Sequence, residues 1–145
     1  KLHANSNNPA PELIINFVPE ERRQQLLMDL SLNIRAIVSQ RLIPTKEGKG
    51  RRAAIEVLLN SPLIQDQIFK GEVHEIKSTM ARSRELGMQT FDQSLFDLYE
   101  EGAISYEDAL RNADSVNELR LKIKLEGQES KDKDVMSGIE HLNIV

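Results

Sequence analysis

Three histidines, His3, His74 and His141, are the side chains that could bind a metal or transfer protons near neutral pH. None of them has a second histidine or a carboxylate at a spacing typical of metal sites, such as His-Glu-x-x-His. The chain has no cysteine, which excludes a thiolate zinc site, a disulfide and a cysteine nucleophile. No serine lies in a Gly-x-Ser-x-Gly sequence. The residue types therefore predict no metal site and no complete catalytic site.

The pair Gly48-Lys49 is the one place where a phosphate-binding loop can be sought. A Walker A loop needs a Ser or Thr after the lysine and a glycine five residues before the Gly-Lys pair. Here Gly50 follows the lysine, and the earlier glycine is absent. Two glycines so close together favour a hairpin turn instead. We expect no nucleotide-binding loop in this chain.

Length and composition indicate one globular domain with an aliphatic core. The chain has 145 residues, of which 39% are hydrophobic and 4% aromatic. Its net charge of −4 argues against a dedicated nucleic-acid-binding domain, which is normally basic. No stretch approaches the roughly 20 apolar residues that span a membrane. Residues 1–8 contain neither an initiator Met nor an apolar signal-peptide core, so we expect the chain to begin inside a longer or processed product.

The charges are unevenly distributed along the chain. Residues 20–52 contain eight basic and four acidic side chains, whereas residues 92–118 contain eight acidic and one basic. Either the two segments attract each other, or each meets a partner of opposite charge, or both are solvated faces of a helical protein.

The pattern of apolar and turn residues predicts a β-hairpin near 34–59 in a mostly helical chain. Pro19 and the two glutamates after it suit the first turn of a helix over 19–32. β-branched and alternating apolar residues then predict two strands, over 34–43 and 51–59. Capping residues and glycines delimit four further predicted helices, over 61–71, 73–86, 91–102 and 105–113.

The segment after Ser115 carries two conflicting patterns. Ser115 and Glu118 form a capping pair typical of a helix start. Leucine and isoleucine nevertheless alternate with charged residues over 119–125, which is the period of a strand. We expect one helical turn followed by extended chain. Because 126–134 is polar, we expect a disordered tail over 126–145.

Several segments resemble, in order and spacing, the motifs of one known protein family. Residues 86–95 read Leu-Gly-Met-Gln-Thr-Phe-Asp-Gln-Ser-Leu and resemble the family signature Leu-Gly-Met-Gln-Thr-x-Asp-x-x-Leu. Leu-His-Ala-Asn at 2–5 resembles the end of the family's His box. Val-Ser-Gln-Arg-Leu at 38–42 and Gly-Arg-Arg-Ala-Ala-Ile-Glu-Val-Leu at 50–58 resemble two family strands. Asn-Ser-Pro at 60–62 opens the next helix as in the family. The family that these motifs resemble is the PilT/PilU family of type IV pilus retraction (twitching motility) ATPases.

Within the family, the chain resembles the PilU branch more than the PilT branch. PilT carries Ala-Ile-Arg-Asn-Leu-Ile-Arg-Glu where residues 64–71 read Ile-Gln-Asp-Gln-Ile-Phe-Lys-Gly, so only the apolar positions Ile64 and Ile68 match. The retraction role of that motif therefore does not transfer residue by residue. Residues 108–116 resemble the ending of the PilU and secretion-ATPase branch.

The resemblance implies an α/β parent protein with a RecA-like P-loop ATPase fold, of which this chain is the mostly helical C-terminal part. It implies a hexamer that binds ATP and Mg and hydrolyses ATP. The family's P-loop, Asp box and Walker B would precede Lys1. His3 is then the one family active-site residue in the chain, as a sensor of the γ-phosphate. The chain alone is expected to bind no cofactor and to be inactive.

The resemblance also implies a division of the chain and its interfaces. Residues 1–18 would end the nucleotide-binding core, 19–125 would complete the RecA-like domain, and the tail would follow. The candidate subunit-interface residues are Arg51 and Arg52, for which hairpin solubility is an equal explanation. The residues of the helix expected to transmit motion to a partner are Ile64, Ile68 and Phe69.

The implied partners are a PilT-type paralogue and a pilus platform protein, at the cytoplasmic face of the bacterial inner membrane, without membrane insertion. The chain alone is expected to self-associate through uncovered apolar surface.

Two other functions remain open on the residues. One is a stand-alone helical adaptor that binds a protein through its acidic 92–118 face. The other is a weak nucleic-acid binder using the basic residues of 20–52, against which the acidity and the few aromatics argue.

Overall fold

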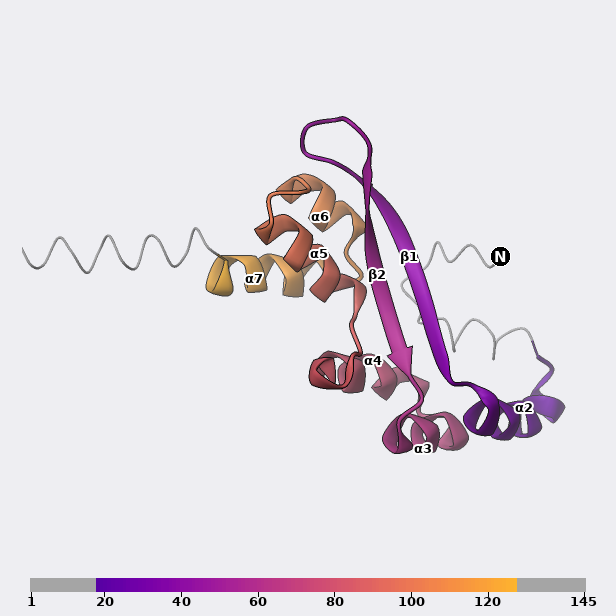
Figure 1. The fold of residues 1–145 in the computed structure, drawn as a ribbon. Helices are drawn as coiled ribbons and strands as arrows, with labels where there is room; N and C mark the ends of the chain where they lie inside the picture. Colours follow the sequence, from indigo (N-terminus) through magenta and orange to yellow (C-terminus); the bar gives the residue numbers. More distant parts are fainter. Residues whose placement is uncertain (1–17, 128–145) are drawn as a thin grey trace, which may run out of the picture. The chain divides into compact units, whose positions relative to one another are not determined.

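The computed structural model describes residues 18–127 (Figure 1). These residues divide between two compact units. Unit 1 contains the residues up to Gln40 together with Ile55–Thr90, and unit 2 contains Arg41–Ala54 together with the residues from Phe91 onward. Residues 18–127 form six α-helices, one short 3-10 helix and a two-stranded hairpin. The prediction of a mostly helical chain with one hairpin is therefore confirmed.

The hairpin consists of β1 (Ala36–Pro44) and β2 (Arg51–Leu59), which are hydrogen-bonded neighbours. The N–H of Thr45 donates to the Gly50 carbonyl at 3.2 Å and closes the turn. Gly48 and Gly50 have φ angles of 73° and 92°, in the left-handed region that side chains rarely adopt. The Gly48-Lys49-Gly50 segment is thus the predicted hairpin turn.

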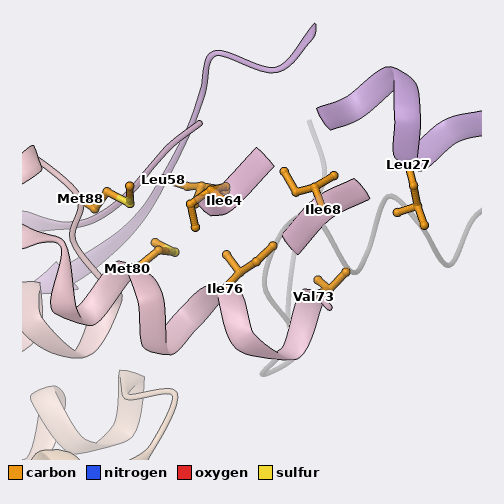
Figure 2. Packing of buried hydrophobic residues seen from close by; sticks show 8 residues of the cluster. All are labelled: Leu27, Leu58, Ile64, Ile68, Val73, Ile76, Met80 and Met88. Atoms are coloured by element: carbon orange, nitrogen blue, oxygen red, sulfur yellow. The ribbon is translucent and has the colours of Figure 1, made fainter. Parts of the chain in front are cut away.

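Unit 1 packs α2 (Glu20–Asn33), α3 (Pro62–Lys70) and α4 (Val73–Arg82) around one apolar cluster. Figure 2 shows its eight buried side chains gathered between the helices and the end of β2: Leu27, Leu58, Ile64, Ile68, Val73, Ile76, Met80 and Met88. The Asn60 side-chain amide donates to the carbonyls of Ser31 at 2.9 Å and Ile34 at 2.8 Å, and so ties the start of α3 to the end of α2.

The predicted helix over 73–86 is interrupted in the structure. α4 ends at Arg82, and a single 3-10 turn, η1 (Arg84–Leu86), follows. The Ser83 hydroxyl donates to the Thr79 carbonyl at 2.7 Å, a bond that competes with the helical backbone pattern. Gly87 then ends the turn with φ at 92°, as its residue type predicts.

Unit 2 packs α5 (Phe91–Glu100), α6 (Tyr106–Asn112) and α7 (Val116–Glu126) against one another. Two members of its buried cluster, Ile43 and Ala54, come from the turn half of the hairpin. The full cluster consists of Ile43, Ala54, Phe91, Leu95, Leu98, Ile104, Ala109 and Leu119. The Ser105 hydroxyl accepts the Asp108 N–H at 3.1 Å, so the predicted cap of α6 is confirmed.

The predicted extended chain over 119–125 is wrong, because α7 continues to Glu126. Leu119 is buried, and Ile123, one turn later, packs against the same cluster. The other two leucines of the alternating pattern, Leu121 and Leu125, are 56% and 65% exposed. The alternation therefore reflects two helix faces, not the two faces of a strand.

The predictions for residues 1–17, including His3, and for 128–145, including most of the expected tail, lie outside the described residues. In the described part of the chain, no helix has both the length and the hydrophobicity needed to cross a membrane.

Candidate functional site

Residues 86–95, which match the family signature, are called the signature segment below. Its first half, 86–90, belongs to unit 1 and is attached there to strand β2. Met88 is 1% exposed and packs into the first apolar cluster. Gln89 and Val57 exchange two backbone hydrogen bonds, of 2.8 and 3.0 Å, which form an antiparallel bridge on β2. The Gln89 side-chain amide also donates to the Ile55 carbonyl at 2.8 Å. The Met-Gln pair of the signature thus holds this segment along the strand.

The second half of the signature organises unit 2. Phe91 and Leu95 are 6% and 0% exposed and belong to the second apolar cluster. The Asp92 carboxylate accepts the backbone N–H groups of Asp114 at 2.8 Å and Ser115 at 2.9 Å. Because Ser115 is the residue before α7, Asp92 supplies the anion that the start of that helix favours.

Arg41 completes the same network from β1. Its guanidinium donates to the Asn112 carbonyl and to the Asp114 carboxylate, both at 2.7 Å. It also lies 3.9 Å from the centroid of the Phe91 ring, a cation–π distance. The Asp114 side chain is 7% exposed, so this ion pair is shielded from solvent screening.

The roles of Arg41, Asp92 and Asp114 were not predicted from the sequence. All three lie in segments that resemble the family, Arg41 in 38–42, Asp92 in 86–95 and Asp114 in 108–116, and this resemblance was the available signal. Arg41 comes from the basic segment and Asp114 from the acidic one, so the two segments do attract each other at this point. The arrangement fixes the end of α6 and the start of α7 to β1 and α5.

The two predicted interface arginines differ in their contacts. Arg52 donates to the Glu101 carboxylate at 3.0 Å, and the two side chains are 50% and 57% exposed. Arg51 is exposed and forms no ion pair with the residues that the structure describes. Arg52 is thus bound within its own chain, and the subunit-interface role of both residues stays a prediction.

We expect Arg52→Ala to change the free energy of unfolding by less than about 1 kcal/mol, because exposed ion pairs are screened by water and salt. Chemical denaturation of the whole chain measures this, with Arg51→Ala, its neighbour at the start of β2, as the matched control. A loss several times larger for Arg52 than for Arg51 would contradict the solvated geometry.

The helix expected to transmit motion, α3, buries two of its three predicted residues. Ile64 and Ile68 are 0% exposed and form the core of unit 1, so neither is available for direct contact with a partner. Phe69 is 42% exposed, and Leu63, which was not predicted, is 53% exposed. The exposed apolar residues of α3 are therefore Leu63 and Phe69. The role of this helix in transmitting motion stays a prediction.

Two polar contacts involve α3, one to α4 and one within the helix itself. Inside, the Gln67 amide donates to the Thr79 hydroxyl at 2.9 Å across to α4. Outside, the Lys70 ammonium lies 2.7 Å from the Asp66 carboxylate, which raises the pKa of Lys70 by hydrogen bonding and then by charge. The first contact holds α3 to α4, and the second joins successive turns of α3.

The histidines supply no reactive centre in the described residues. His74 is 77% exposed on α4, with its Nε2 atom 3.5 Å from the Glu75 carboxylate. Over 18–127, no three residues of the types His, Cys, Asp and Glu are gathered in a way that could hold a metal ion.

Two curated relatives that match this chain are both type IV pilus ATPases. No family model matches the chain. The type IV pilus ATPase PilU of Pseudomonas aeruginosa is 62% identical over 138 residues, which are 95% of this chain and 36% of that protein. The type IV pilus retraction ATPase PilT of the same organism is 33% identical over 112 residues, or 77% of this chain and 32% of PilT.

A solved structure agrees with these relatives. The crystal structure of the pilus retraction motor PilT with bound ADP superimposes with a TM-score of 0.71 and 31% sequence identity, over 82% of this chain and 33% of that one. The chain thus spans about a third of the length of the curated relatives it matches.

Proposed function

Because the chain belongs to the PilT/PilU family of type IV pilus ATPases, we propose that it is the C-terminal part of a hexameric motor that hydrolyses ATP to power pilus retraction and twitching motility. The observation that carries this proposal is the 62% identity to PilU, which extends over 95% of the chain. The same match covers 36% of PilU, which supports placing the nucleotide site in the remaining part of the protein.

In this proposal, the chain packs against the nucleotide-binding core and passes on its motion. Residues 1–18 end that core, with His3 as the sensor of the γ-phosphate. Residues 19–125 complete the RecA-like domain. The signature segment is suited to transmission because it carries two attachments three residues apart: Gln89 pairs with Val57 of β2, and the Asp92 carboxylate accepts the Ser115 N–H before α7.

The partners in this proposal follow from the family. ATP and Mg bind in the preceding part of the protein, and six copies form the ring. A PilT-type paralogue and the platform protein of the pilus are the expected partners, and the ring acts at the cytoplasmic face of the inner membrane. Neither nucleic acid nor insertion into the membrane belongs to this function.

Titration with MgATP tests the proposal. We expect the chain alone to bind and hydrolyse no ATP, and a longer protein with about 200 preceding residues, roughly one further domain, to do both. Hydrolysis by the chain alone would overturn the proposal. If the longer protein also fails to bind ATP while the chain binds another protein, the adaptor function takes its place.

We also expect the chain alone to self-associate. Leu32, Val38 and Leu63 of unit 1 are 59%, 65% and 53% exposed, and association removes such surface from water. The mass measured by light scattering should rise with concentration, and more steeply for the chain than for the longer protein. A strictly monomeric chain at high concentration would contradict this expectation.

A further inference from the structure

The last described helix, α7, presents apolar side chains on two faces. Leu119 and Ile123 face the second apolar cluster. Leu121 and Leu125, also one turn apart, are 56% and 65% exposed. A helix that covers one core needs a single apolar stripe. The second stripe, Leu121 and Leu125, therefore indicates a second apolar contact.

The sequence after α7 contains a segment that fits this stripe. Residues 128–134 are all polar or charged. From Val135 onward apolar residues return, and Val135, Ile139 and Leu142 are spaced by four and three residues, which places them on one face of a helix. The pattern is that of a connection followed by an amphipathic segment.

The connection is long enough for that segment to return along α7. α7 has 11 residues and is therefore about 16 Å long. The residues between Glu126 and Val135 reach about 28 Å when extended. Connections of this length commonly join antiparallel helices.

We propose that the stripe formed by Leu121 and Leu125 is a docking surface for residues 135–145 of the same chain. A segment tethered so closely has a millimolar effective concentration, which favours it over a second copy of the chain.

Disulfide trapping tests the docking. Because the chain has no native cysteine, every disulfide that forms must involve the introduced cysteines. The test variant is Leu121→Cys with Ile139→Cys in the whole chain. The matched control is Arg120→Cys with Ile139→Cys, since Arg120 is exposed on the same helix but about 100° around it. At micromolar protein we expect the test pair to form an intramolecular disulfide at least about tenfold faster than the control pair.

Equal rates for the two pairs would overturn the proposal. Disulfides that mainly join two chains would also overturn it, and would assign the stripe to a second copy. Hydrogen exchange covers the case in which the cysteine variants fold poorly. We expect the backbone amides of residues 135–145 to be protected from exchange in the unsubstituted chain. The double variant Leu121→Lys with Leu125→Lys should lower this protection by a factor of about ten or more. The control Leu42→Lys should leave it unchanged. Absence of protection in the unsubstituted chain would overturn the proposal.

Discussion

Replacing Leu95 with alanine is expected to lower the free energy of unfolding of unit 2 by about 2 to 5 kcal/mol. Leu95 is the last residue of the signature segment and is 0% exposed within the second apolar cluster. The substitution removes buried methyl groups and leaves a cavity that close-packed neighbours fill only in part. In a thermal scan, we expect the melting temperature to fall by about 10 °C or more.

The control for this prediction is Leu42→Ala, because Leu42 belongs to the same unit but is 53% exposed. We expect it to change the free energy of unfolding by less than about 1 kcal/mol. Equal effects of the two substitutions would show that Leu95 is not a core residue of unit 2.

Asp92→Ala is expected to have the next largest effect, a loss of about 2 to 4 kcal/mol. The substitution removes the acceptor of the Asp114 and Ser115 N–H groups, at 2.8 and 2.9 Å, and leaves both donors partly buried without it. Hydrogen bonds to a charged acceptor contribute more than neutral ones. Chemical denaturation followed by circular dichroism measures the loss.

Two variants separate the capping role of Asp92 from a general effect of charge. Asp92→Asn keeps one carbonyl acceptor and should fall between the wild type and Asp92→Ala. Glu107→Ala removes an exposed acidic residue in the first turn of α6 and should change stability by less than about 0.5 kcal/mol. A loss for Glu107→Ala as large as that for Asp92→Ala would contradict the specific role of the Asp92 hydrogen bonds.

The fold was largely predictable where local chemistry decides it. Gly48 and Gly50 determined the hairpin turn, and Ser105 determined the start of α6, because each acts on its own backbone neighbourhood. The α7 prediction failed for the opposite reason. The alternation over 119–125 has the period of a strand, and only the contact of Leu119 and Ile123 with a core formed by distant residues selects the helix.

The candidate site was predictable only as a family signature. Nothing in the local sequence relates Arg41 to Asp114, which follows it by 73 residues, and their 2.7 Å contact depends on the tertiary fold. The same limit applies to Ile64 and Ile68. Their spacing indicates an apolar helix face, but the sequence does not reveal that this face lies in the core of unit 1 and is closed to a partner.

Exchange of segments within a living motor tests the central claim most directly. The chimera carries this chain in place of the matching 138 residues of the Pseudomonas aeruginosa PilU, in cells from which PilU has been deleted. The same chimera with Leu95→Ala is the control for loss of folding. We measure pilus-dependent surface motility against intact PilU and an empty vector. We expect the chimera to restore motility to the level of intact PilU. A chimera that is as abundant as PilU and hydrolyses ATP, yet leaves motility at the level of the empty vector, would contradict a role of this chain in the pilus motor.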